Sequence, residues 1–160
     1  ARLTEYAAEK ATATYHEGSV WTYAGNYDIA LPCATQNEIN GEAAKRLVAQ
    51  GVICVSEGAN MPSDLDAIKV YKENGIFYGP AKAANAGGVA VSALEMSQNS
   101  LRLSWTREEV DGRLKDIMTN IFNTAKTTSE TYGLDKDYLA GANIAAFENV
   151  ANAMIAQGIV

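Results

Sequence analysis

The chain contains three short runs of apolar residues, separated by stretches in which apolar positions recur every three or four residues. The runs occupy residues 28–31, 52–55 and 75–78. Because they are continuous rather than alternating, they are typical of parallel strands covered on both faces of a sheet. Their even spacing leaves room between neighbouring runs for one helix and two short loops. This order predicts a parallel sheet with right-handed crossovers.

Helices are predicted between these strands and ahead of them. One spans residues 40–50 and ends at Gly51, as helices commonly do at glycine. The next begins after Ser63, a favourable N-cap residue, and ends at residues 74–75. A further helix is predicted over residues 2–15, before the first strand.

From Tyr78 onward the pattern is helical. Helices are predicted over 87–100, after a capping box formed by Thr106 and Glu109, and over 138–157. In a capping box each side chain bonds the other residue's backbone N–H. The last two helices carry apolar residues at intervals of three and four, which predicts one buried face on each. Those residues are Val110, Leu114, Ile117, Met118, Ile121, Phe122 and Ala125 in the first, and Phe147, Val150, Ala151, Met154 and Ile155 in the second.

Together these elements predict an α/β fold: a partial Rossmann-like parallel sheet with helices on both faces, followed by C-terminal helices. A chain of 160 residues is long enough for one domain with a core. The net charge of −6, without a basic patch, argues against nucleic acid or an anionic membrane as a partner. No apolar run is long enough to span a membrane, and the start of the chain does not have the pattern of a signal peptide.

The cysteines and the histidine suggest no metal or nucleophile chemistry. Cys33 and Cys54 lie in or beside apolar runs, and neither has a metal-type partner at short spacing. We therefore expect reduced thiols, a cytoplasmic location and no metal site. The one histidine, His16, lies in a polar stretch and is assigned no catalytic role.

The loops that follow the three strands form the predicted ligand site, since ligands bind outside the carboxyl ends of the strands in open parallel sheets. These loops comprise residues 32–39, 56–62 and 79–88. Each is rich in small residues, which let a flat ligand approach the backbone. Their side-chain amides, Gln36, Asn60 and Asn85, can donate and accept hydrogen bonds at once. A carboxamide ring such as nicotinamide needs that mixed character.

The same loops resemble segments of NAD(P)-dependent glutamate dehydrogenases, most closely the hexameric bacterial type. The matching segments are residues 32–39, 57–62 and 85–99, and the tail around 141–144 and 153–158 is also similar. The third, Asn-Ala-Gly-Gly-Val-Ala-Val-Ser-Ala-Leu-Glu-Met-Ser-Gln-Asn, is the most specific. The resemblance covers essentially the whole chain. It implies reversible oxidative deamination of L-glutamate to 2-oxoglutarate and ammonia, with hydride transfer to NADP or NAD, in a homo-oligomer that is a hexamer.

The resemblance also implies residue roles. In the family, the first segment lies along the nicotinamide ribose, and an asparagine from each of the other two approaches the nicotinamide. The implied coenzyme-binding residues are Ala34, Thr35, Gln36, Asn60 and Asn85. Val89 and Ser92 are the implied substrate contacts, with the Ser92 hydroxyl taking the side-chain carboxylate of glutamate.

Two features of the family pattern are not found in this sequence. The Gly-x-Gly-x-x-Gly turn that opens a dinucleotide fold is absent, and so is the substrate domain with its catalytic lysine and aspartate. Residues 1–160 are therefore predicted to be the distal half of a dinucleotide-binding domain plus a C-terminal helical segment. No catalytic residue is assigned, and we expect the chain alone to be inactive.

Several alternatives remain open at this point. The protein could be a dehydrogenase of leucine or phenylalanine, although an apolar residue would then be expected in place of Ser92. It could be a non-catalytic α/β interaction domain, against which Asn60, Asn85 and Ser92 argue. Ser92 taken alone could be a helix-face hydroxyl bonded to the preceding turn. Lys82 could meet an anion or remain solvated.

Overall fold

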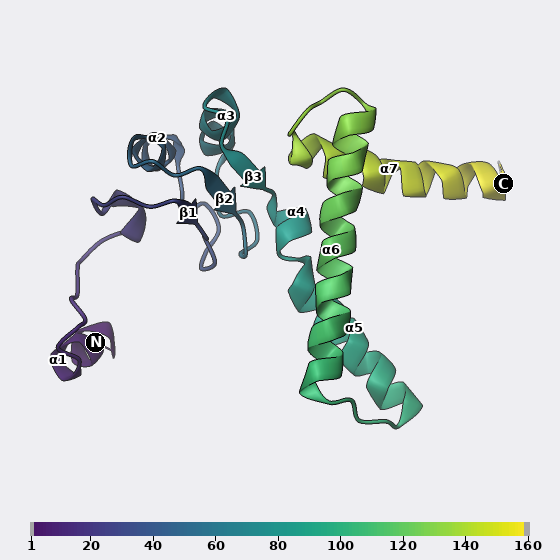
Figure 1. The fold of residues 1–160 in the computed structure, drawn as a ribbon, viewed down its shortest axis with the longest axis horizontal. Helices are drawn as coiled ribbons and strands as arrows, with labels where there is room; N and C mark the ends of the chain where they lie inside the picture. The colour runs from purple at the N-terminus through teal and green to yellow at the C-terminus, as the bar shows by residue number, and fades with distance from the viewer. Residues whose placement is uncertain (1, 159–160) are drawn as a thin grey trace.

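A computed structural model describes residues 2–158 and contains one parallel sheet in the order β1-β2-β3 (Figure 1). The strands are β1 (Ile29–Ala30), β2 (Cys54–Ser56) and β3 (Phe77–Gly79). The connecting helices, α2 (Gly41–Ala49) and α3 (Leu65–Glu73), pack against each other. The predicted parallel α/β fold is confirmed. The strands are shorter than their apolar runs, and all three begin one or two residues later than predicted.

The core lies between the sheet and the α2–α3 pair. Ala30, Val55 and Tyr78 are aligned across the three strands and are all buried in one cluster with residues of α2 and α3. At the neighbouring positions of β1 and β3, whose side chains point to the opposite face, Ile29 is 58% and Phe77 is 41% exposed. In residues 2–158, helices α2 and α3 therefore cover one face of the sheet, while α7 (Tyr138–Gln157) contacts the sheet at β3.

Short polar side chains start both crossover helices. Asn40 accepts the N–H of Ala43 at 2.9 Å, and Asp64 accepts the N–H of Ala67 at 2.8 Å. The prediction that Ser63 caps the second helix is therefore wrong. Ser63 is buried, and its hydroxyl lies 3.2 Å from that of Tyr71. Asp64 has the same capping chemistry one residue later, so the sequence pattern did not separate the two.

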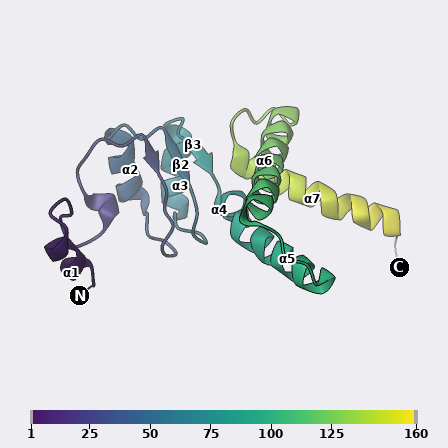
Figure 2. The same cartoon turned by 60° about the horizontal axis from the view of Figure 1, so that its bottom comes forward.

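The C-terminal half is built from α4 (Ala81–Ala84), α5 (Ala86–Leu101), α6 (Arg107–Thr131) and α7. The short helix α4 was not predicted. It is separated from α5 only by Asn85, which is the C-cap of the first and the N-cap of the second. Figure 2 shows that α5 and α7 both contact the long helix α6, with α7 crossing it, on the side of the molecule away from α2.

The capping box that begins α6 is confirmed. Thr106 donates its N–H to a Glu109 carboxylate oxygen at 2.7 Å, and Glu109 donates its N–H to the Thr106 hydroxyl at 3.2 Å. Hydrogen bonds from the backbone and the side chain of Thr106 to the Glu109 carboxylate lower the pKa of Glu109 below its ordinary value. The reciprocal bonds satisfy two backbone groups that a helix start leaves free.

The two ends of the chain differ from the prediction. Helix α1 (Arg2–Glu9) ends before the predicted residue 15, where threonines at 12 and 14 weaken the helix. The predicted stripe on α7 is not buried in residues 2–158, since Phe147 is 70% and Ile155 is 79% exposed. Figure 1 shows this part of α7 extending away from the other elements. No helix within residues 2–158 is both long enough and apolar enough to cross a membrane.

Helices α6 and α7 cross at a glycine. Gly141, on α7, is buried, and a Cβ added there would overlap the carbonyl oxygen of Ala125 and lie 3.1 Å from the Cβ of Ser129. The Ser129 hydroxyl donates to the carbonyl of Asp135 at 2.5 Å, which fixes the turn between the two helices. The crossing therefore depends on the backbone of α7 lying directly against that of α6.

We predict that Gly141→Ala lowers the free energy of unfolding by about 1–3 kcal/mol, because the added methyl overpacks this crossing. Gly112→Ala, on the same pair of helices, is the matched control. A Cβ at Gly112 meets nothing within 4 Å, and alanine in a helix interior should stabilise by about 0.5–1 kcal/mol. Denaturant titration of both variants measures the two shifts. Equal effects of the two substitutions would contradict the assigned crossing.

Candidate functional site

The loops after β1 and β2 are joined by backbone hydrogen bonds. Gly58 and Ala59 both donate their N–H groups to the carbonyl of Pro32, at 3.0 and 3.1 Å. Farther along, Asn37 donates to the carbonyl of Met61 at 3.0 Å, and Ile39 donates to that of Pro62 at 2.9 Å. Residues 32–39 and 56–62 therefore form one continuous surface at the carboxyl edge of the sheet, which we call the loop edge.

Asn85 connects the third loop to this surface. Its side-chain nitrogen lies 2.6 Å from the Asn60 side-chain oxygen and 3.2 Å from the carbonyl of Ala59. The two asparagines that were predicted separately, in loops 56–62 and 79–88, are thus in direct contact. Each amide restricts the other side chain, so their positions are set before any ligand arrives.

The orientation of both amides follows from Ala59. A carbonyl only accepts, so the Asn85 atom beside it must be Nδ2, and the Asn60 atom that faces the same Nδ2 must then be Oδ1. Within residues 2–158, Asn60 Nδ2 and Asn85 Oδ1 have no hydrogen-bond partner. The pair therefore leaves one donor group and one acceptor free, the two kinds of group that a carboxamide can bond.

An open hollow of about 440 Å³ adjoins Asn60. It is lined by Cys33, Ala34, Gln36, Gly58, Ala59 and Asn60. The structure thus brings together three of the predicted coenzyme residues, Ala34, Gln36 and Asn60. The hollow depends on close packing at its base, because a Cβ at Gly58 would lie 2.5 Å from the Cys33 sulfur. Cys33 is exposed and Cys54 half-buried, and both thiols are free.

Glu38 holds the loop that contains Ala34 and Thr35. One of its carboxylate oxygens accepts the backbone N–H groups of Ala34 and Thr35, at 2.9 and 3.2 Å. The other accepts the indole N–H of Trp21 at 2.8 Å. Thr35 thus contributes to the loop through its backbone. Sequence reasoning missed Glu38, although a carboxylate three residues after Thr35 is spaced to bond that amide.

Glu57 was also missed, and it is 2% exposed. One of its oxygens accepts the N–H of Ser63 at 3.2 Å, and the other accepts the Tyr78 hydroxyl at 2.7 Å and the N–H of Ala81 at 2.8 Å. Burial, together with the hydrogen bond and charge of Glu57, raises the pKa of Tyr78 above its ordinary value. Burial likewise raises the pKa of Tyr71 to about 12. Both phenols therefore stay neutral and can donate at ordinary pH.

Val89 lies four residues after Asn85 along α5, and Ser92 lies three residues after Val89, which places all three on one helix face. Neither lines the hollow. Val89 is 71% exposed, and the Ser92 hydroxyl donates to the carbonyl of Gly88 at 3.3 Å. The sequence left open that Ser92 is a helix-face hydroxyl bonded to the preceding turn, and this is the bond that the structure shows. The Lys82 side chain takes neither of the two roles considered for it. Its ammonium donates to the Asn143 side chain at 2.6 Å.

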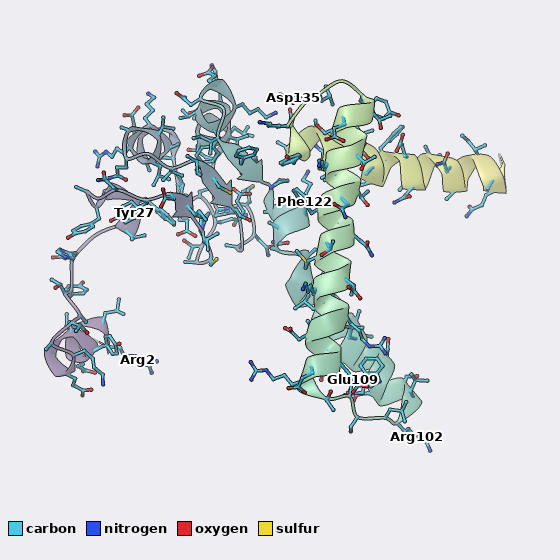
Figure 3. The ribbon with its side chains drawn as sticks, viewed as in Figure 1. Arg2, Tyr27, Arg102, Glu109, Phe122 and Asp135 are labelled. Atoms are coloured by element: carbon cyan, nitrogen blue, oxygen red, sulfur yellow. The ribbon has the colours of Figure 1, made fainter. Side chains whose placement is uncertain are left out.

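A second hollow, of about 400 Å³, lies between β3 and α6. Its lining includes Phe77, Met118, Ile121 and Phe122, and no side-chain amide; Figure 3 marks Phe122 on α6. Because it offers an apolar surface with few polar groups, it suits a carboxamide less well than the loop edge does. Within residues 2–158, no group of three or more His, Cys, Asp or Glu side chains could hold a metal ion.

A parallel sheet with an amide pair at its carboxyl edge is consistent with a nucleotide-dependent enzyme fold, and comparison with known proteins identifies the family. The chain belongs to the family described as Glutamate/Leucine/Phenylalanine/Valine dehydrogenase, whose model matches residues 1–158.

The individual relatives show which members of this family the chain is similar to. The chain is 52% identical, over 99% of its length, to an NADP-specific glutamate dehydrogenase of Giardia intestinalis, of which it covers 36%. It is 54% identical, again over 99%, to a glutamate dehydrogenase of Bacteroides thetaiotaomicron, of which it covers 35%. The crystal structure of Plasmodium falciparum glutamate dehydrogenase superposes with a TM-score of 0.93 at 48% identity, covering 100% of this chain and 34% of that one. The chain thus spans about a third of the length of these relatives.

We predict that Gly58→Ala destabilises the loop edge, because the new methyl group would press on the Cys33 sulfur. Overpacking of this kind costs about 1–3 kcal/mol. Cys33→Ala should rescue it, since the next nearest atom to the added Cβ, the Cys33 Cβ, is 3.5 Å away. Thermal unfolding of the two single variants and the double variant measures the coupling. Strictly additive effects would show that the two side chains do not meet.

Proposed function

We propose that this chain is the distal half of the dinucleotide-binding domain, with the C-terminal helical segment, of an NAD(P)-dependent glutamate dehydrogenase. The reaction would be the reversible oxidative deamination of L-glutamate to 2-oxoglutarate and ammonia. The observation that carries the proposal is the Asn60–Asn85 pair at the carboxyl edge of the sheet. The names of the relatives support glutamate as the substrate, and the identity to them extends over nearly the whole chain.

The loop edge fits the nicotinamide end of NADP or NAD. When bound, the coenzyme accepts or supplies the hydride. Asn60 Nδ2 would donate to the carboxamide oxygen and Asn85 Oδ1 would accept from its nitrogen, since these are the two atoms left free by the contact between the side chains. Ala34, Thr35 and Gln36 would lie along the ribose. Glu38 keeps that loop in place by holding two of its amides.

The substrate side is assigned to Val89 and Ser92. They follow Asn85 on one face of α5, with Val89 at the end of its first turn and Ser92 one turn farther on. The free backbone N–H groups and the dipole at the start of that helix favour an anion nearby. Ser92 would exchange its present acceptor, the carbonyl of Gly88, for the side-chain carboxylate of glutamate. A dehydrogenase of leucine or phenylalanine would have no use for a hydroxyl there, and a non-catalytic domain would have no use for the amide pair.

The assembled enzyme is proposed to be a cytoplasmic homo-oligomer, a hexamer by resemblance. The segments that the relatives have beyond the matched third would supply the catalytic lysine and aspartate. Closure of the substrate domain formed by those segments over the loop edge would exclude water from the site.

The first test separates the chain from the full-length protein that carries it. The full-length protein should bind NADPH or NADH in a fluorescence titration and should reduce NADP or NAD when glutamate is added. The 160-residue chain should show no glutamate-dependent reduction, because it contains no assigned general base. Turnover by the isolated chain, or none by the full-length protein, would contradict the proposal.

Ser92→Val in the full-length protein tests the substrate assignment. It should lower kcat/KM for glutamate by roughly one to two orders of magnitude, the value of a hydrogen bond to a charged group. Activity on norvaline, which has no side-chain carboxylate, should fall much less or rise. Coenzyme affinity should stay the same. Both substrates are compared at saturating coenzyme, and equal losses on the two would assign Ser92 to the fold or to the nicotinamide instead.

A further inference from the structure

Glu57 is a buried acid to which the proposed function gives no role. It lies directly after β2, is 2% exposed, and has no ion-pair partner within residues 2–158. Three donors satisfy it instead, and they come from three separate places: Ser63 ahead of α3, Tyr78 in β3 and Ala81 at the start of α4. A buried carboxylate is costly unless it is fully hydrogen-bonded, so this arrangement requires all three segments to be in place.

The two backbone donors belong to the two segments that carry the asparagines. The bond from Ser63 to Glu57 closes residues 57–63 into a loop, with Asn60 in its middle. The bond from Ala81 to Glu57 fixes the first residue of α4, and Asn85 is the C-cap of that helix. One carboxylate therefore holds the loop that carries Asn60 with one oxygen and the helix that carries Asn85 with the other.

We propose that Glu57 is a positioning residue for the coenzyme: it sets the distance and angle between Asn60 and Asn85, and so the shape of the donor–acceptor pair offered to the carboxamide. This inference rests on the proposed function for the identity of the ligand. The carboxylate itself does not line the hollow, and it acts through the two amides.

A carboxylate suits this place better than an amide. Both oxygens of Glu57 face donors, and its two backbone partners, at Ser63 and Ala81, can only donate. In Glu57→Gln one of the two oxygens becomes an NH₂ group, which would face an N–H. Whichever way the amide turned, one of the two backbone segments would lose its attachment.

The experiment compares Glu57→Gln with Tyr78→Phe in the full-length protein. Glu57→Gln should raise the Kd for NADPH and the KM for coenzyme by roughly ten- to hundredfold, with the KM for glutamate nearly unchanged. Tyr78→Phe is the matched control, because it removes one donor from the same carboxylate and leaves both backbone attachments. Its Kd for NADPH should change by less than about threefold, although both variants lower Tm.

Hydrogen exchange measured by mass spectrometry gives a readout that does not need the coenzyme. Glu57→Gln should speed exchange in residues 57–63, in residues 80–86 or in both, whereas Tyr78→Phe should leave both segments protected. If wild-type protein binds neither NADPH nor NADH, the proposed function fails, and this measurement alone decides the role of Glu57 in fixing the asparagine pair.

Ala81→Pro provides a second variant in case Glu57→Gln does not fold. It deletes only the N–H that Glu57 Oε2 accepts, at the first position of α4, where proline is tolerated. It should also weaken NADPH binding. If Glu57 contributed only to stability, Glu57→Gln and Tyr78→Phe would lose coenzyme affinity equally at equal loss of Tm. Alternatively, Ala81→Pro would leave the affinity for NADPH unchanged. Either result would overturn the inference.

Discussion

The alignment of Ala30, Val55 and Tyr78 across the three strands is the constraint on which the other features depend. All three residues are buried together against the α2–α3 pair, and apolar burial of this kind is the main favourable term in folding. Because the strands are parallel, fixing their register brings the ends of all three to one edge of the sheet. The loops that carry the amide residues begin there, so the packing of three side chains determines where the site forms.

The loop edge is then held together mainly by hydrogen bonds. Pro32 accepts two N–H groups from the next loop, Glu38 holds two amides of its own loop, and Glu57 connects the second loop to α4. The acceptors in this network are placed by backbone segments that the sheet has already positioned. Such support fixes the geometry of a binding site before its ligand arrives, and less ordering then opposes binding.

Local patterns in the sequence correctly predicted those structural features that depend only on residues close together in the chain. The capping box of Thr106 and Glu109, the crossovers and the parallel order are all of this kind, because spacing and side-chain type are enough to specify them. The choice between Ser63 and Asp64 as the cap was wrong, because burial of Ser63 against Tyr71 depends on tertiary packing. Glu57 was missed for the same reason, since an acid in a loop looks solvated until the donors around it are known. Glu38 is different, because it bonds amides only three and four residues away and its spacing in the sequence was a usable signal. The exposed apolar stripe on α7 shows a different limit of sequence reasoning. Helical periodicity identifies an apolar face but does not say what covers it.

Asn85 has a mechanical consequence beyond its role as a hydrogen-bond donor. It is the single residue between α4 and α5, and therefore the junction through which the chain passes from the sheet to the long C-terminal helices. Its side chain is at the same time attached to Asn60 and Ala59 on the sheet side. A rotation of α5 relative to α4 changes the backbone dihedrals of this residue and so pulls directly on the amide pair. A change in the direction of α5 at this junction and a change in the geometry of the amide pair are therefore coupled.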